Sequence, residues 1–246
     1  MLWYKAWLET RWRFLLCLGG LVFCCGFFVL AEGTGENFKR LPSWAFTPRQ
    51  ARELLFRAHQ GLVALFPIAA ILLGMGGMLR EKATGVASFT LGLPVSRTRL
   101  MLSRIGMGAL QTLLLSLAPW IAMLAVVYFY LRQPVSVAFS SSLLLALISG
   151  GLLLFSMAVL VSCVVEGEYT APVAAFGIFV VNIYGTVLFD SLREWNVIRF
   201  MRLQEYVDRG TWTIKPALPL GGIAVAFALT ILLALLSTVA VERRDF

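Results

Sequence analysis

Long apolar runs without a single charged side chain are the feature that most constrains this chain. About 20 helical residues cross the roughly 30 Å of hydrocarbon in a bilayer, and a backbone in lipid must satisfy its own hydrogen bonds. The sequence therefore predicts an all-α polytopic membrane protein with a single transmembrane domain. The six expected spans lie at about 14–31, 61–79, 105–131, 143–165, 171–189 and 220–241.

The composition supports this class. Hydrophobic residues make up 59% of the chain and charged residues only 14%, whereas soluble domains carry about 25% charged residues. The four cysteines all fall inside apolar runs, which favours small buried hydrophobes over disulfides or metal ligands. The net charge of +8 comes from basic residues beside the spans, so it predicts contacts with membrane lipids and not with nucleic acid.

The N-terminal segment, residues 1–13, alternates tryptophans with basic side chains. Indoles prefer the boundary of the bilayer, and cations prefer the lipid phosphates. The rival interpretation, a secretory signal, lacks a clean small-x-small cleavage site. The pattern therefore predicts a retained elbow helix lying in the headgroup layer.

The second span has a distinct beginning and a distinct packing face. Thr47 can cap a helix that has Pro48 in its first turn. The next turns place small and apolar side chains on one face, and Ala70 and Gly74 have the spacing of a close helix contact. Pro67 and, in the third span, Pro119 are interpreted as packing kinks. The apolar face predicted near the start of the helix consists of Ala51, Leu54, Leu55 and Ala58.

The largest polar insertion, residues 190–215, is predicted to be an amphipathic outer segment. Ser191 and Glu194 have the spacing of a capping box, and Gly210 can end the helix that they start. Trp195, with Leu192, Ile198 and Met201, forms an apolar stripe. We expect the helix to lie on the membrane or to cap the bundle.

The most informative connection, residues 80–97, joins two of the apolar spans. Glu81 to Leu91 can form a short helix, and Gly92 to Pro94 can break it. Ser96 can then cap the next helix. A short helix held between two spans is expected to act as a mechanical part.

This connection resembles the signature of ABC-2 type ABC exporter permeases. The matching pattern is E-x-x-x-G-x-x-x-F-T-L-x-L-P-V-S-R, and the chain departs from the usual family sequence at Val86 and Ser88. The last residues, from Glu242 to Phe246, resemble the Arg-Asp ending of that family. The matching residues are Glu81, Gly85, Phe89, Thr90, Leu91, Leu93, Pro94, Val95, Ser96 and Arg97.

The resemblance implies a transport subunit whose partner supplies the energy. The connection would be a cytoplasmic coupling helix seated in a partner ATPase, which would hold ATP and Mg, and the permease would work as a homo- or heterodimer. The resemblance also implies an inner-membrane protein with both termini in the cytoplasm. Charge does not decide this orientation, because ten basic residues would lie inside and eleven outside. The residues assigned to ATPase coupling are Arg80, Glu81, Gly85, Phe89, Pro94 and Arg97.

Motifs for chemistry in the chain itself are absent from the sequence. No G-K-[ST] phosphate loop occurs, so we expect no ATP site, no bound cofactor and no enzymatic activity. The one histidine, His59, lies at a span boundary and is interpreted as an interfacial residue. The six spans carry no Asp, Glu, Lys or Arg, which disfavours a carrier driven by ion gradients.

Two polar residues within the spans, Gln111 and Asn182, have two interpretations: part of a substrate path, or donors in interhelical hydrogen bonds. The function predicted overall is the permease subunit of an ABC exporter for an amphipathic or lipid-like substrate, such as a drug, peptide or lipid. An intramembrane protease or lipid-modifying enzyme is one alternative. A membrane scaffold that does not transport is another.

Overall fold

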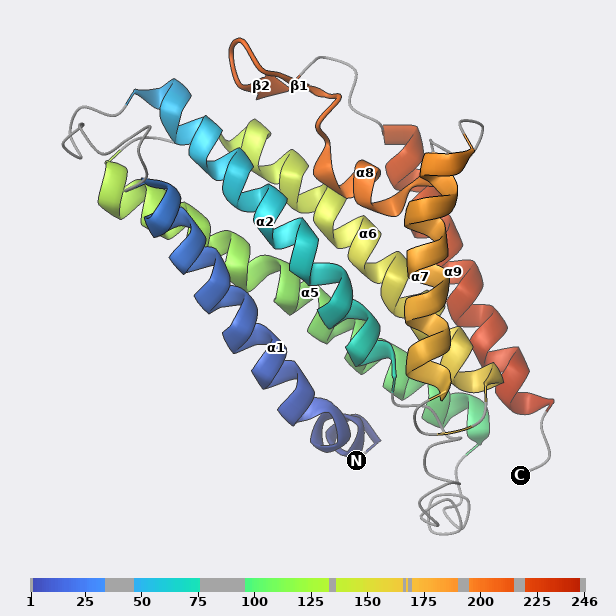
Figure 1. The fold of residues 1–246 in the computed structure, drawn as a ribbon. Helices are drawn as coiled ribbons and strands as arrows, with labels where there is room; N and C mark the ends of the chain where they lie inside the picture. Colours follow the sequence, from blue (N-terminus) through green and yellow to red (C-terminus); the bar gives the residue numbers. More distant parts are fainter. Residues whose placement is uncertain are drawn as a thin grey trace.

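In the computed structural model the chain folds into a bundle of long helices (Figure 1). The structure describes most of the chain, with gaps at some connections and at the ends. The described residues are 2–33, 47–75, 96–132, 136–165, 167, 170–189, 195–214 and 220–243.

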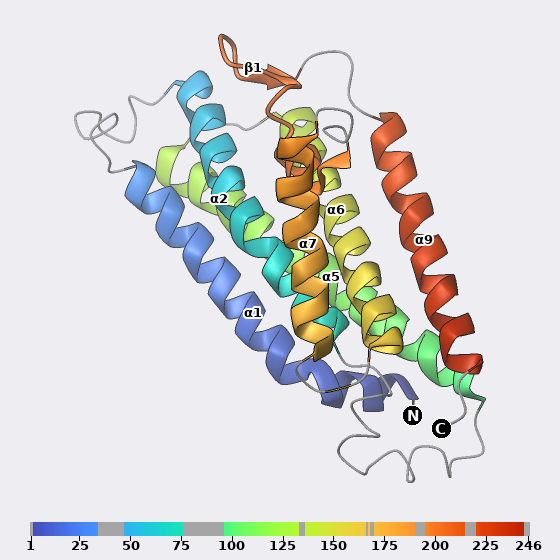
Figure 2. The ribbon, with the colours of Figure 1, turned by 45° about the vertical axis from the view of Figure 1, so that its right-hand side comes forward.

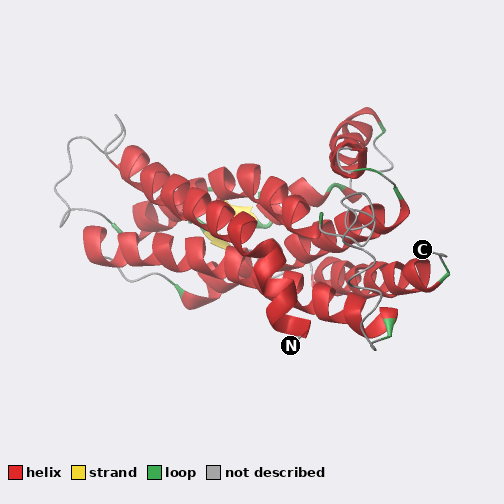
Figure 3. Cartoon of the chain, turned by 90° about the horizontal axis from the view of Figure 1, so that it is seen from below, coloured by secondary structure: helices red, strands yellow, loops and turns green. Residues whose placement is uncertain are grey.

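Within the described ranges, six long helices make up the bundle, and one short helix and one hairpin accompany them. The short helix is α8 (Val197–Arg202), and the hairpin pairs β1 (Val207–Asp208) antiparallel with β2 (Thr213–Ile214). Figure 3 shows how small the strands are beside the helices. The long helices are α1 (Leu2–Gly33), α2 (Pro48–Gly74), α5 (Arg97–Leu131), α6 (Val137–Val164), α7 (Thr170–Leu188) and α9 (Leu220–Glu242).

All six long helices of the described ranges are long and apolar enough to cross a membrane. Many large apolar side chains on their outer faces are exposed, among them Leu16 and Phe129. In water such faces would be covered, whereas acyl chains solvate them. The expected all-α polytopic class with six spans is therefore confirmed.

The core of the bundle is built on α2 and α6. About two thirds of the most apolar window of each is buried, against about a fifth in α1, α7 and α9. Helix α6 lies between α2, α5 and α9, and α1 packs along α5 and α2 (Figure 1). Gly74 lets α2 approach α6 closely, since an added Cβ would lie 2.6 Å from the Ala158 Cβ. The predicted close contact is thus found at Gly74, where the partner is α6, and Ala70 is buried one turn earlier.

The start of α2 agrees with the sequence pattern. The Thr47 hydroxyl accepts a hydrogen bond from the Gln50 N–H, and the Gln50 side chain accepts from the Thr47 N–H at 2.9 Å. This reciprocal pair satisfies two N–H groups that the first helical turn leaves free. The helix continues without interruption through Pro67, and α5 does so through Pro119. The predicted apolar face, Ala51, Leu54, Leu55 and Ala58, is buried.

The N-terminal elbow and the first span are one helix. Helix α1 continues through Arg13, where the sequence suggested a boundary, and its axis turns near the N-terminus (Figure 2). Trp3 packs on α5, since an added Cβ at Gly106 would lie 2.7 Å from the Trp3 ring. Part of the predicted elbow therefore lies against the protein.

The predicted long helix between Ser191 and Gly210 is wrong. The Asn196 side chain accepts from the Arg199 N–H at 3.0 Å and starts α8 there. The helix ends at Leu203, which has a left-handed φ of 50°. Gly210 lies in the turn of the hairpin, where the Asp208 carboxylate accepts from its N–H at 3.0 Å. Ser191 and Glu194 lie outside the described residues.

The two ends of the bundle differ in what they hold. Both chain termini lie at one end, here called the terminal end, together with the C-terminal end of α2 and the start of α5 (Figure 2). The hairpin lies at the opposite end, here called the hairpin end. Helix α8 lies on that side of the bundle, against α6 (Figure 1).

Candidate functional site

The predicted coupling segment is bracketed by described helix ends. Arg97 is the first residue of α5, and Ser96 caps that helix as expected by accepting from the Arg99 N–H at 3.3 Å. On the other side, α2 ends at Gly74, and its C-cap residue Met75 is the last described residue before the segment. The other residues assigned to coupling, Arg80, Glu81, Gly85, Phe89 and Pro94, lie outside the described residues.

The C-terminal end of α2 is tied to two neighbouring helices. The Arg13 guanidinium of α1 donates to the Met75 carbonyl oxygen. The Ser162 hydroxyl of α6 donates to the Gly74 carbonyl oxygen at 3.4 Å. These donors satisfy carbonyl groups that the last turn of a helix leaves free. A displacement of this end of α2 would therefore also displace the bonded parts of α1 and α6.

The start of α5 is tied to α1 and α9. The Arg104 guanidinium lies 3.1 Å from the Glu9 carboxylate, and only 11% of the Arg104 side chain is exposed. The Thr98 hydroxyl donates to the Glu242 carboxylate near the end of α9. We call the contacts of Glu9–Arg104, Arg13–Met75 and Thr98–Glu242 the terminal-end network.

Gln111 of α5 forms a further contact between α5 and α1, deeper in the bundle than the Glu9–Arg104 pair. Its side chain is 1% exposed, and its Nε2 donates to the Thr10 hydroxyl at 2.7 Å. Thr10 in turn donates to the Ala6 carbonyl oxygen at 3.0 Å. The structure thus supplies the interhelical hydrogen bond that was one interpretation of Gln111. A substrate path at Gln111 stays a prediction.

Asn182 belongs to a different network at the hairpin end. Its Nδ2 donates to the Trp195 carbonyl oxygen at 3.0 Å, and its Oδ1 accepts from the Val197 N–H at 3.3 Å. The Asn196 amide donates to the Thr186 hydroxyl of α7 at 2.7 Å. Asn182 therefore fixes the start of α8 to α7, and its partners are separate from those of Gln111.

Helix α8 is also held by α2 and α6. The His59 ring lies 2.9 Å from the Met201 carbonyl oxygen, and Gln60 donates to the Arg202 carbonyl oxygen at 2.9 Å. An added Cβ at Gly150 would lie 2.3 Å from the Met201 side chain. His59 is accordingly buried under α8, although the sequence suggested an interfacial position.

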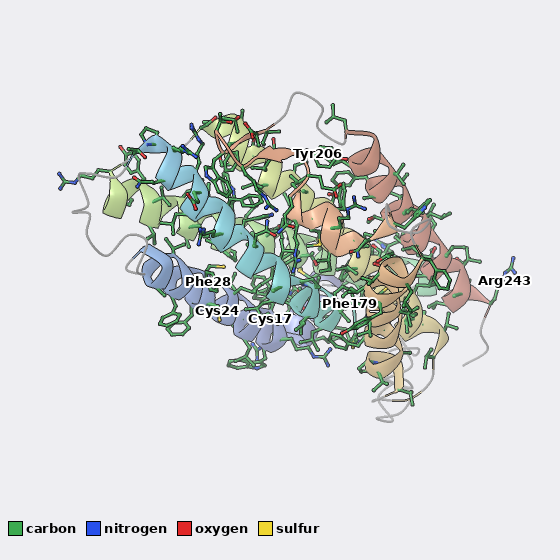
Figure 4. All side chains as sticks on the ribbon, turned by 45° about the horizontal axis from the view of Figure 1, so that its top comes forward. Cys17, Cys24, Phe28, Phe179, Tyr206 and Arg243 are labelled. Atoms are coloured by element: carbon green, nitrogen blue, oxygen red, sulfur yellow. The ribbon has the colours of Figure 1, made fainter. Side chains whose placement is uncertain are left out.

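A cavity of about 700 Å³ opens between α2, α7 and α8. Its α7 wall is mostly apolar: Phe179, whose position Figure 4 marks, Ile183 and Val187 line it together with Thr186. Its α8 wall carries Arg199, Arg202 and Glu205. We call it the hairpin-end cavity. No pattern in the sequence predicts this cavity, because it depends on how α8 packs.

Metal chemistry has no candidate in this part of the molecule. Within the described ranges, no group of three His, Cys, Asp or Glu side chains is placed to hold a metal ion. The four cysteines are free thiols, and Cys17 and Cys24 both lie on α1 (Figure 4).

Comparison with known proteins identifies the family. A family model described as ABC-2 family transporter protein matches residues 31–196, which is more than half of the chain and includes α2, α5, α6 and α7. No curated protein matches the chain. The chain therefore belongs to the ABC-2 transporter family and is a multi-pass membrane permease of an ABC transporter.

Proposed function

We propose that this permease is an exporter subunit that moves an amphipathic or lipid-like substrate with ATP hydrolysed by a partner ATPase. The observation that carries the proposal is the terminal-end network. Both helix ends that bracket residues 80–97 are bonded to neighbouring helices by side chains of Arg13, Arg104 and Thr98. A displacement applied to that connection would therefore move several spans together.

The proposed mechanism has two states biased by nucleotide. Closure of the ATPases around ATP would push the 80–97 connection, where Phe89 is the proposed anchor in the partner. Helices α1, α2, α5 and α6 would follow as one unit. The end of α2 is bonded to α1 and α6, and the start of α5 is bonded to α1 and, through Thr98, to α9. The change would reach the hairpin end, where α7 and α8 contact α2 and α6. The permease would act as a homo- or heterodimer.

The orientation proposed for this mechanism places the terminal end in the cytoplasm. Single cysteines at Ser43, Ser88 and Ser191, in a background without native cysteines, should label differently with an impermeant maleimide added outside. Positions 43 and 191 should react, and position 88 should not. Labelling at 88 from outside would reverse the orientation and remove the coupling role.

Isolation of the permease from its native membrane tests the proposal as a whole. A tagged chain should capture an ABC ATPase, and the captured complex should hydrolyse magnesium-ATP in liposomes. The chain freed of its partner should hydrolyse none above background, because it has no phosphate loop. The proposal fails if no ATPase is captured or if the isolated chain hydrolyses ATP by itself.

A further inference from the structure

The hairpin-end cavity combines an apolar wall with a cationic wall. On α7, Phe179, Ile183 and Val187 face it, and the Val187 side chain is 71% exposed. On and just after α8, three charged groups face it, namely Arg199, Arg202 and Glu205. A volume of about 700 Å³ is in the range of small-molecule sites.

The positive charge in this cavity that lacks an acidic partner among the described residues is that of Arg202. Arg199 is paired with Glu205, whose carboxylate accepts from the Arg199 Nε at 2.9 Å. Arg202 has no such partner among the residues that the structure describes, and its Nε is buried without a hydrogen bond. Among the residues that the structure describes, the groups that face the cavity therefore carry one uncompensated positive charge.

Two other arginines with a buried, unbonded Nε differ from Arg202. Arg11 lies over the Trp12 ring at 5.5 Å, and Arg52 donates to the Thr211 carbonyl oxygen at 3.2 Å. Each of these guanidinium groups thus has a partner within the described part of the chain. Arg202 combines an unbonded guanidinium with a cavity large enough for a ligand.

The depth of α8 makes a free charge there costly. Met201 packs against Gly150, which lies seven residues inside the predicted span 143–165, or roughly 10 Å of helix below its start. A cation near hydrocarbon is stable only with an anion, water or a path to the interface. An apolar helix covering the cavity would leave Arg202 buried without an anion.

We propose that the hairpin-end cavity binds an anionic phospholipid of the surrounding bilayer, with its phosphate on Arg202 and an acyl chain along the α7 wall. A guanidinium matches a phosphate with two parallel hydrogen bonds. The apolar wall selects a ligand with a chain over free phosphate. The proposal concerns lipid binding only, so it does not depend on the direction of transport or on the partner ATPase.

Native mass spectrometry of the delipidated chain in detergent tests this site with three probes. Phosphatidylglycerol carries both phosphate and chains, diacylglycerol has only the chains, and glycerol 3-phosphate has only the phosphate. Phosphatidylglycerol should bind at least about tenfold more tightly than either of the others, which corresponds to the loss of one charged contact or of one buried chain. Equal binding of glycerol 3-phosphate would leave only an anion site, and equal binding of diacylglycerol would leave only an apolar groove. Either result overturns the lipid proposal.

Variants locate the binding event. R202Q should weaken phosphatidylglycerol binding about tenfold, and R202K should restore part of it. The matched control is R209Q, because Arg209 is exposed in the hairpin turn outside the cavity and should leave binding unchanged. Should R202Q fail to fold, as judged by its thermal unfolding, I183W serves instead, because it fills the apolar wall and leaves Arg202 in place.

Unchanged lipid binding in a folded R202Q or I183W variant would overturn the proposal. So would efficient crosslinking of two copies through a cysteine at Val187 in the native membrane, because a second copy would then occupy the cavity. Capture of an ATPase is scored separately, so a failure of lipid binding leaves the proposed function untouched.

Discussion

The arginine side chains at the terminal end and at the hairpin end of this permease differ in the partners that they have. At the terminal end, Arg104 is paired with Glu9, and Arg13 is bonded to the end of α2. At the hairpin end, the Arg202 guanidinium faces a cavity of about 700 Å³ and is paired with no carboxylate among the described residues, because the Glu205 carboxylate there is bonded to Arg199. The first arrangement joins helices to one another, and the second is open to a ligand.

This difference follows from what each end contacts. Long side chains of α1, α5 and α9 reach across helix boundaries at the terminal end, so the ends of α2 and α5 are held from several sides. At the hairpin end, α7 is largely exposed, and α8 bridges it to α2 and α6. We therefore expect substitutions at the terminal end to affect stability and coupling, and substitutions around the cavity to affect binding.

The largest effect is expected where α2 packs closely against α6 at Gly74. Gly74→Leu would force a side chain into a contact where even a Cβ would lie 2.6 Å from Ala158 and 2.7 Å from the Phe155 carbonyl oxygen. We expect a loss of about 3 kcal/mol of stability, the upper range for overpacking, measured by thermal unfolding in detergent. Gly177→Leu on α7 is the control, because an added Cβ there meets no described atom within 4 Å. Equal effects of the two changes would mean that the terminal end is no more tightly packed than α7.

A smaller effect is expected at the proposed ATPase anchor. Phe89→Ala should weaken association with the partner ATPase by about 2 kcal/mol, or roughly 30-fold, as loss of a buried aromatic anchor does. Insertion and dimerisation should stay normal. Pull-down of the ATPase measures this, with Phe129→Ala on the exposed hairpin-end part of α5 as the control. If Phe89 contacts only the lipid headgroup layer, both variants will capture the ATPase normally, and the rate of ATP hydrolysis will be unchanged.

The smallest expected effect is the difference between the coupling energies of two ion pairs. Double-mutant cycles with glutamine at Glu9 and Arg104 should give a coupling energy of about 1 kcal/mol, because that pair is partly buried between two helices. The pair of Glu53 and Arg57, within one helix turn of α2 and with 40% of the Arg57 side chain exposed, should give about 0.3 kcal/mol. Thermal unfolding of the four members of each cycle supplies both values. A larger value for the α2 pair would contradict the special role of the terminal end.

Local patterns in the sequence were sufficient to predict most of the long helices. Length and the absence of charge are properties of each span by itself, so α7 and α9 begin within one residue of their predicted starts. The cap at Thr47 was predictable for the same reason, since its partner Gln50 is three residues away. In contrast, the partners in the terminal-end network lie far apart in the chain: 62 residues separate Arg13 from Met75, and 144 separate Thr98 from Glu242. No local spacing reveals such pairs.

The error at α8 has a local cause and a remote cause. The capping-box spacing of Ser191 and Glu194 competed with Asn196, which caps the helix that forms. A turn signal was present at Asp208 and Gly210, and it would have predicted the hairpin in place of the end of a long helix. The contacts of Met201 with Gly150 and of Arg202 with Gln60 depend on the packed bundle. The hairpin-end cavity therefore could not be predicted from the sequence.

In the proposed mechanism the helices of the terminal end move as a unit, so the separation of α2 and α7 beside the hairpin-end cavity should change with nucleotide. Spin labels in the ATPase-bound permease, with the native cysteines replaced by alanine, test this claim directly by double electron–electron resonance. One pair at Leu8 and Leu102 measures the contact of α1 with α5, and one pair at Leu65 and Leu188 measures the separation of α2 and α7 beside the cavity; all four side chains are exposed. Trapping the ATPase with ATP and vanadate should shift the second distance by several Å and the first by less than about 2 Å, the scale of a helix adjustment within one packed unit. A large shift between Leu8 and Leu102, with the distance between Leu65 and Leu188 unchanged, would contradict the account.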